Sequence, residues 1–422
     1  MASLKVFLGK KHIANLLVNS DLEYEFRYVD GYDGFSISPH ISTTSLATSS
    51  SIKNFLHNIL PEGRVLDDIV NFTHISKDNL FALIKELGFE SSGALSFTSD
   101  DLRDKALFRE IKTSELIERI DTIEQKSIAI WDKKPRLSLA GVQDKLAVII
   151  QNDKIGLANG TLSSTHILKF QTLRYNHIVL NEFYCMSLAR QCGIDTANCH
   201  IERFQEHLVL NVERFDRVIR KEHIERLHII DACQLLDVSP LYKYERAFGK
   251  GRDVADIRNG VSFDKLFKAT QDLKVPAVAK LKILDWALFN LIIGNSDAHG
   301  KNISFFIDNR GIEVAPFYDI LSTIVYTDIE HDLAMAFGDE FDIDDVLGYD
   351  LVEFANSIGL PKQLVSVRVD LIAKSILKHI ETIPIELINQ NEVVFIKHLK
   401  ELISQRAKRY LDISKEMLKI NT

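Results

Sequence analysis

The sequence has little cysteine and no long apolar run. Four cysteines in 422 residues are too few for a disulfide scaffold, and they suit a reducing compartment. No apolar run approaches the roughly 18 residues of a membrane span, and residues 1–11 lack the apolar core of a signal peptide. We therefore expect a cytoplasmic protein with no membrane partner.

The cysteines also lack the spacing of a metal site. Cys185, Cys192 and Cys199 recur every seven residues, and His200 follows the last of them. Because zinc sites use much closer pairs, such as C-x-x-C, we interpret these residues as buried or incidental thiols.

A basic excess is absent as well. The formal net charge of -8 argues against a broad nucleic-acid-binding face, which needs clustered lysine and arginine. Hydrophobic residues make up 46% of the chain and charged residues 26%, which is typical of a globular protein. Since single cores stop growing at about 250 to 300 residues, we expect two or three subdomains.

The first hundred residues predict a small β-rich unit. Strand-like runs cover residues 4–8, 13–18 and 23–28, with glycines at the turns. A Ser/Thr-rich run at residues 42–51 is typical of a loop, although its composition also permits disorder, and helical patterning follows as far as Leu87. We place the first boundary near residue 100.

The densest polar cluster lies in residues 291–307. Asn295, Asp297, His299, Lys301 and Asn302 fall within eight positions, between a predicted helix at 280–291 and a predicted strand at 303–307. Asp297 and Asn302 stand five apart, as do the Asp and Asn of the kinase catalytic loop H-R-D-x-x-x-x-N. Phosphoryl transfer is therefore the leading hypothesis.

A second carboxylate follows this loop. Residues 303–307 and 312–314 predict a hairpin that would place Asp319 beside the loop, as a second magnesium-binding carboxylate requires. Asp297 would orient the substrate hydroxyl or accept its proton, while Asn302 and Asp319 would hold Mg²⁺ through oxygen ligands.

Two residues of the loop have open roles. His299 would either support the loop by hydrogen bonding or take part in catalysis. Lys301 would neutralise phosphate charge, although a lysine in a polar loop is more often solvated.

Upstream residues could bind ATP phosphates. Lys169 lies in a predicted strand, where an isolated lysine usually faces solvent, and Glu182 follows in a helical pattern. A strand lysine followed by a helix glutamate is the order of the kinase pair that holds ATP. Lys145 would also contact phosphates, although the loop before it has one glycine, Gly141, where kinases have three.

Residues 208–217 predict a strand that ends in charged residues. In a kinase, Glu213 to Phe215 would lie in the connection between lobes, and their backbone groups would bind adenine. Solvated charges at a strand end explain the same pattern equally well.

Two alternatives use the same residues. In a metal-dependent phosphohydrolase, Asp297, His299 and Asp319 would bind a transition metal that activates water; this leaves Lys169 and Glu182 unexplained. In a catalytically inactive, kinase-like scaffold, Asp297, Asn302 and Asp319 would not need to converge on one ion.

Taken together, these segments resemble the HipA family of serine/threonine kinases, the toxin components of bacterial toxin–antitoxin pairs. The resemblance runs from near the N-terminus to about residue 340. Its motifs are residues 55–64, Gly93-Ala-Leu-Ser96, Ser138-Leu-Ala-Gly-Val-Gln-Asp-Lys145, Val212-Glu-Arg-Phe-Asp-Arg217, Lys243-Tyr-Glu245, Asn295-Ser-Asp-Ala-His-Gly-Lys-Asn302, Tyr318-Asp319 and Leu333-Ala-Met335.

The resemblance implies an α+β, two-lobed protein-kinase-like fold. Residues 1–100 would form an added N-terminal β-rich subdomain, 101–217 the kinase N-lobe and 218–422 a mainly helical C-lobe. It implies a protein serine/threonine kinase with ATP and Mg²⁺ as cofactors, and it agrees with the roles given to Lys169, Asp297, Asn302 and Asp319.

The resemblance also implies regulation and partners. A family serine at the position of Ser138 is an autophosphorylation site, and a phosphate there would repel ATP phosphates. Family members pair with a small helix-turn-helix antitoxin that contacts DNA, so this chain would meet DNA only through that partner. Known family targets include aminoacyl-tRNA synthetases.

Overall fold

The computed structural model describes residues 2–101, 106–136, 143–172, 174–220 and 223–421. The chain divides into two compact units. The first unit comprises residues 1–172, 200–240 and 305–311, and the second comprises 173–199, 241–304 and 312–422. The sequence predicted three parts, residues 1–100, 101–217 and 218–422. That division remains a prediction.

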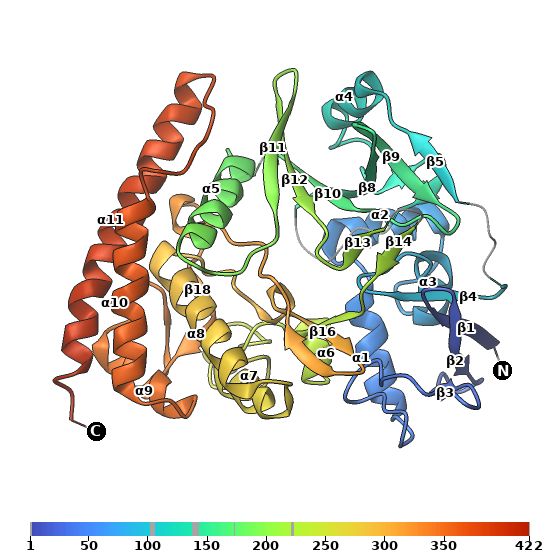
Figure 1. Cartoon of the computed structure of the whole chain (residues 1–422), viewed down its shortest axis with the longest axis horizontal. Coiled ribbons are helices and arrows are strands. Elements are labelled where there is room, and N and C mark those ends of the chain that lie inside the picture. Colours follow the sequence, from blue (N-terminus) through green and yellow to red (C-terminus); the bar gives the residue numbers. More distant parts are fainter. Residues whose placement is uncertain (1, 102–105, 137–142, 173, 221–222, 422) are drawn as a thin grey trace. The chain divides into compact units, whose positions relative to one another are not determined.

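The first unit begins with a four-stranded antiparallel sheet in the order β3-β2-β1-β4 (Figure 1). Its three N-terminal strands confirm the predicted runs and bury alternate apolar residues. The strands and the helices that follow are β1 (Ala2–Leu8), β2 (Lys11–Val18), β3 (Tyr24–Tyr28), β4 (Leu95–Thr98), α1 (Ser49–Ile59), α2 (Gly63–Thr73) and α3 (Leu80–Leu87).

The polar run at 42–51 is not a loop throughout. Thr48 caps α1, because its side-chain oxygen accepts a hydrogen bond from the Ser51 backbone N–H at 3.0 Å. The expectation of a loop is wrong for Ser49 to Ser51, since a threonine N-cap lets the polar residues that follow begin a helix.

A six-stranded sheet in the order β11-β12-β10-β8-β9-β5 forms the rest of this unit's framework. One of its faces packs with α4 (Thr113–Asp121) in a core that includes Leu146, Leu168 and Phe170. The strands are β5 (Leu107–Glu110), β8 (Lys145–Gln151), β9 (Lys154–Asn159), β10 (His166–Phe170), β11 (Cys199–Phe204) and β12 (His207–Glu213).

Short elements complete the first unit, and they interrupt the helical composition expected after residue 217. These are β6 (Ile130–Trp131), β7 (Lys134–Pro135), β13 (Arg217–Ile219), β14 (Ile224–Arg226), β15 (Ile229–Asp231), α6 (Ala232–Leu235) and β16 (Ser304–Asp308).

The second unit is mainly helical, and its long helices α10 and α11 lie side by side (Figure 1). The predicted helical character of residues 343–421 is confirmed. The elements are α5 (Ile178–Gln191), α7 (Phe263–Ala269), α8 (Pro276–Ile293), β17 (Gly311–Val314), β18 (Asp332–Phe337), β19 (Glu340–Asp342), α9 (Gly348–Ser357), α10 (Lys362–His379) and α11 (Gln390–Met417), with 3-10 turns at Pro240–Tyr242, Thr270–Asp272, Gly300–Asn302 and Thr323–Val325.

Candidate active site

Helix α8 holds the polar loop from a buried position. All of its residues from Trp286 to Ile293 are buried, and it ends at Gly294, whose φ of 78° is left-handed. A Cβ at Gly294 would lie 2.5 Å from Ile324 Cδ1. Glycine therefore serves both the backbone turn and the close approach of the neighbouring segment.

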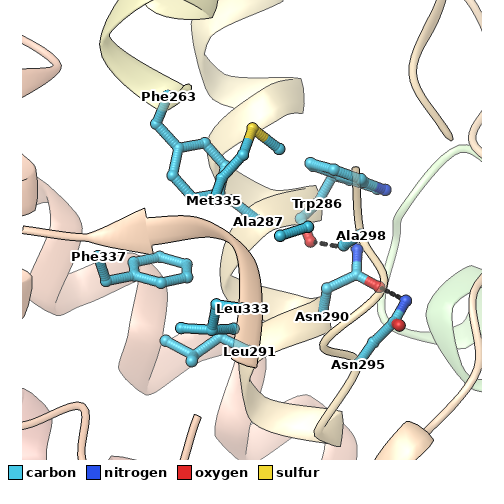
Figure 2. Close-up of a pocket in the computed structure, with 11 residues that line it drawn as sticks. Phe263, Trp286, Ala287, Asn290, Leu291, Asn295, Ala298, Leu333, Met335 and Phe337 are labelled. Carbon is cyan, nitrogen blue, oxygen red and sulfur yellow. Dashed lines mark hydrogen bonds between the residues drawn. The ribbon is translucent and has the colours of Figure 1, made fainter. Parts of the chain in front are cut away.

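Two buried amides connect this helix to Asp297. The Asn290 side chain donates to the Trp286 carbonyl at 2.8 Å and accepts from the Asn295 amide at 2.7 Å (Figure 2). Asn295 Oδ1 accepts in turn from the Asp297 backbone N–H at 3.1 Å. The backbone of Asp297 is therefore fixed by a chain of neutral hydrogen bonds that begins inside α8.

The cavity beside these amides is not large enough for a substrate. It is lined mainly by apolar side chains of α7, α8 and β18 around Asn290 and Asn295 (Figure 2). Its space admits no more than about one water molecule.

The loop closes on Asp297 through its backbone carbonyl. That carbonyl accepts from the His299 N–H at 2.8 Å and from Asn302 Nδ2 at 2.9 Å. The side chain of Asp297 is half-buried, and Tyr244 donates its hydroxyl proton to Asp297 Oδ1 at 2.7 Å. The five-residue spacing thus brings Asp297 and Asn302 into direct contact.

His299 and Lys301 are both 5% exposed. The His299 ring packs edge-to-face against Tyr244 with a centroid separation of 5.1 Å. The interpretation of Lys301 as a solvated lysine is wrong, because all three residues of the 3-10 turn Gly300–Asn302 are buried.

Asp319 adjoins the same loop. The Tyr318 hydroxyl donates to the Lys301 carbonyl at 2.7 Å and lies 2.8 Å from Ser304 Oγ, which joins the Asp319 segment to the Asn302 segment. Asp319 has a left-handed φ of 60°. Outside glycine, such a backbone occurs mainly at Asp and Asn and often marks functional sites.

Asn302 and Asp319 fit a magnesium site by chemistry. The Asn302 amide NH₂ is directed at the Asp297 carbonyl, which leaves Oδ1 as the atom that would coordinate an ion. Asp319 offers a half-buried carboxylate. Mg²⁺ prefers such oxygen ligands and keeps several waters, so one carboxylate and one amide suffice.

A group of three or more His, Cys, Asp and Glu side chains able to hold a metal ion is absent from the residues that the structure describes. The transition-metal alternative required Asp297, His299 and Asp319 to form such a group.

Helix α5 anchors the segment that follows Asp319. Asn181 donates to the Ser322 carbonyl at 2.9 Å and accepts from the Ser322 N–H at 3.0 Å. Glu182, the next residue on α5, is buried. Lys169 belongs to the first unit, so a pair between Glu182 and Lys169 remains a prediction.

The two phosphate-binding candidates of the first unit are direct neighbours. Lys169 on β10 is the register partner of Lys145 on β8, so both side chains point to one face of the sheet. This is the face opposite Leu168 and Phe170, which lie in the core. Each lysine is only 6% exposed, so Lys169 does not face solvent as an isolated strand lysine usually does.

Glu213 ends β12, and Phe215 packs edge-to-face with Phe306 at 5.8 Å. Glu213 is exposed, and the Arg214 backbone N–H between these two residues bonds the Thr165 carbonyl at 2.9 Å. Adenine binding by this segment remains a prediction.

The charged residues next to this segment are not solvated. Glu90, Arg214, Asp216, Arg217 and Arg226, which we call the arginine cluster, interact within the first unit. Asp216 accepts from Arg214 at 2.8 and 3.0 Å, from Arg217 at 2.7 Å and from the Gly93 N–H at 2.8 Å. The interpretation as solvated charges at a strand end is wrong for Arg214, Asp216 and Arg217, which are buried and bonded to Ser91 and Gly93. Glu213 itself is exposed.

The guanidinium groups control the carboxyls of this cluster. Burial alone would raise the pKa of Asp216 and Glu90, but the charges of Arg214 and Arg217 outweigh it and the net pKa of both is lowered. Burial lowers the pKa of Arg226 to about 10.

Ser138 lies outside the described residues, as does Gly141 in the same loop.

The sequence did not single out Tyr244 or Asn290 as site residues. Tyr244 lies in the motif Lys243-Tyr-Glu245, which was the one available signal, and Asn290 is a polar residue on an otherwise apolar helix stretch.

Two family descriptions match the chain. Residues 4–98 match the HipA N-terminal domain, and residues 137–380 match the HipA-like C-terminal domain.

Among the described residues, none forms a helix long and apolar enough to cross a membrane.

Individual relatives agree with these matches. The chain is 41% identical to the serine/threonine-protein kinase toxin HipA of Shewanella oneidensis, over 98% of this chain and 97% of that protein. It is 30% identical to Y4mE of Sinorhizobium fredii, over 75% of this chain and 74% of that protein.

A solved structure of Shewanella oneidensis HipA, in complex with HipB and operator DNA, superposes with a TM-score of 0.91 at 40% identity. The match covers 99% of this chain and 100% of that one, and it confirms the predicted α+β, kinase-like fold. The chain therefore belongs to the HipA family of serine/threonine-protein kinases.

Proposed function

We propose that this protein is an ATP- and magnesium-dependent serine/threonine kinase that acts as a HipA-like toxin on a translation-related protein, such as an aminoacyl-tRNA synthetase. The observation that carries the proposal is the loop around Asp297. Its carboxylate is bonded by Tyr244, its carbonyl by Asn302, and the adjoining segment presents Asp319.

Phosphoryl transfer needs positioning and charge neutralisation more than covalent chemistry by the protein. The acceptor hydroxyl oxygen bonds to the γ-phosphorus, the bond from that phosphorus to the ADP oxygen breaks, and Asp297 takes the hydroxyl proton. Asn302 and Asp319 would hold Mg²⁺, and a bound Mg²⁺ would neutralise charge on the phosphate oxygens.

ATP binding is assigned mainly to the first unit. The adjacent, buried Lys145 and Lys169 provide two ammonium groups on one face of the sheet, which suits phosphate oxygens. Glu182 would orient Lys169, and backbone groups of Glu213 to Phe215 would bind adenine, as in other kinases. His299 supports the loop through Tyr244, and the buried Lys301 adds positive charge beside it.

The direct test is transfer of labelled phosphate from ATP by the purified protein, with Mg²⁺ and with Mg²⁺ removed by chelation. Asp297→Asn and Asp319→Asn should each lower transfer strongly, by about 10² to 10⁴-fold for the base. Asp308→Asn is the matched control, because Asp308 forms an exposed ion pair with Arg310. Undiminished transfer by Asp297→Asn would remove Asp297 from its role.

We also propose autophosphorylation at Ser138, on the family resemblance. Mass spectrometry of the protein expressed in active and Asp297→Asn forms tests it. Phosphate on Ser138 in the active form alone supports self-modification, whereas phosphate in both forms identifies another kinase as the source.

The proposed partner is a helix-turn-helix antitoxin, through which the chain would contact DNA in the cytoplasm. The Shewanella complex of HipA, HipB and operator DNA supports this proposal. An antitoxin encoded beside this chain should co-purify with it at a fixed stoichiometry, and separate elution of the two would contradict the proposal.

A further inference from the structure

Tyr244 touches the carboxylate of the proposed base. Its hydroxyl donates to Asp297 Oδ1 at 2.7 Å, across 53 positions of sequence. A carboxylate has two oxygens and several lone-pair directions, so this bond occupies one oxygen and leaves Oδ2 for an acceptor hydroxyl.

The segment that carries Tyr244 is held on several sides. The Lys243 carbonyl accepts from the Gly300 N–H at 3.0 Å, which ties the segment to the loop itself. The Glu245 N–H donates to the Ala334 carbonyl at 2.9 Å, and its carboxylate accepts from the Ala336 N–H at 2.9 Å. Strand β18 and the loop thus fix the backbone on both sides of Tyr244.

The ring of Tyr244 is also constrained. It packs edge-to-face on His299, with an interplanar angle of 89°. Gly260 lies so close that a Cβ there would be 1.8 Å from the Tyr244 carbonyl oxygen. The phenol therefore has little freedom to leave Asp297 by rotation of its own side chain or by movement of its backbone.

The backbone bonds of Asp297 do not fix its side chain. Asn295, His299 and Asn302 bond its N–H and carbonyl, while χ1 and χ2 of an aspartate stay adjustable. A base must be within hydrogen-bond reach of the proton that it takes, at about 2.6–3.2 Å. A rigidly held Tyr244 hydroxyl that donates to Asp297 Oδ1 would also fix the position of Asp297 Oδ2.

We propose that Tyr244 is a positioning residue that orients the Asp297 carboxylate toward the acceptor hydroxyl. This inference rests on the proposed kinase function. It predicts that the Tyr244 hydroxyl contributes to the transfer step and not to ATP binding.

The experiment measures Mg²⁺- and ATP-dependent ADP release, which records transfer to protein hydroxyls and to water alike. Wild type is compared with Tyr244→Phe, Tyr244→Leu and Tyr242→Phe. Tyr244→Phe keeps the ring on His299 and removes only the hydroxyl. Tyr242→Phe is the matched control, since the Tyr242 ring packs edge-to-face with Phe248 at a centroid separation of 6.0 Å.

Tyr244→Phe should lower kcat by about 10- to 100-fold, as expected for a hydrogen bond to a charged group, while KM for ATP stays within about twofold. Tyr244→Leu should lose the same kcat, because both variants lack the hydroxyl, and should also unfold at a lower temperature. A structural role alone would lower only the stability.

Three results would overturn the inference while the kinase function stands: unchanged kcat in Tyr244→Phe, a rise in KM for ATP that matches the loss of rate, or faster turnover in Tyr244→Phe. The last would mean that the phenol occupies the acceptor's place. Failure of the kinase function is recognised separately, because wild type and Tyr242→Phe would then show no Mg²⁺-dependent ADP release at all.

Discussion

Asp216 and Asp297 are both held by hydrogen bonds, but by different kinds of donor. Asp216 is 4% exposed and accepts from two guanidinium groups and a backbone N–H. Asp297 is half-buried and its carboxylate is bonded by a neutral phenol. The first carboxylate is saturated by charge and suits a structural role, while the second keeps an oxygen for chemistry.

The difference extends to the surrounding residues. The arginine cluster joins segment 89–96 to the end of β12 by charge-assisted bonds, such as Arg226 to the Leu95 carbonyl at 2.7 Å. The Asp297 loop is held by amides, hydroxyls and backbone groups. Among the described residues, the side-chain donor recorded on the carboxylate of this loop is the neutral Tyr244 hydroxyl.

The largest effect should come from Asp297. Asp297→Asn should reduce phosphoryl transfer by about 10² to 10⁴-fold with little change in unfolding temperature, because its backbone bonds remain. ADP release measures the loss of phosphoryl transfer, and thermal unfolding of the same variant measures the change in stability. If Asp297→Asn lost as much stability as Asp216→Asn, the distinction between the two aspartates would be lost.

Asp216→Asn should mainly affect stability. The substitution removes the negative charge that pairs with the buried guanidinium groups of Arg214 and Arg217. Removing one partner of a buried ion pair lowers the free energy of unfolding by about 3–5 kcal/mol. Urea unfolding measures this change. Glu225→Gln, at the exposed pair with Arg220, is the control and should change stability by about 1 kcal/mol or less.

His228 should make the first unit sensitive to acid. Burial lowers the pKa of His228 to about 4, so the folded state favours the neutral ring. Stability from this group is fully present above its unfolded pKa of about 6.5 and is lost as the pH falls toward 4, by about 3 kcal/mol. His228→Gln should flatten the dependence of unfolding free energy on pH in this window; an unchanged slope would contradict the assignment.

A smaller effect is expected at Asn290. Asn290→Leu keeps the volume of the side chain but removes the bond to Asn295, at about 1–3 kcal/mol for the buried amide left without a partner. Activity should fall with stability, since Asn295 holds the Asp297 backbone. Full activity at reduced stability would show that the amide chain supports the fold alone.

The sequence predicted much of this arrangement because regular periodicity reports local structure. The alternating residues of β10 and the apolar spacing of α8 located Lys169 and the Asp297 loop correctly. Spacing within one loop also anticipated the contact between Asp297 and Asn302.

The remaining features depend on contacts between distant segments. Tyr244 and Asp297 are 53 residues apart, and nothing in either local pattern indicates their bond. The burial of Arg214 and Arg217 depends on carbonyls of Ser91 and Gly93, more than 100 positions earlier. Lys301 was likewise predicted to be solvated, because the polarity of neighbouring residues in the sequence does not indicate whether a side chain is buried.

The left-handed backbone of Asp319 limits which residues can occupy that position. Among residues with a side chain, asparagine and aspartate adopt such a φ with least strain, and glycine adopts it freely. Of these three, aspartate alone carries a negative charge. Backbone geometry and the proposed binding of an ion would restrict position 319 independently, and together they would leave one amino acid. Alanine there would alter both at once, whereas asparagine changes only the charge.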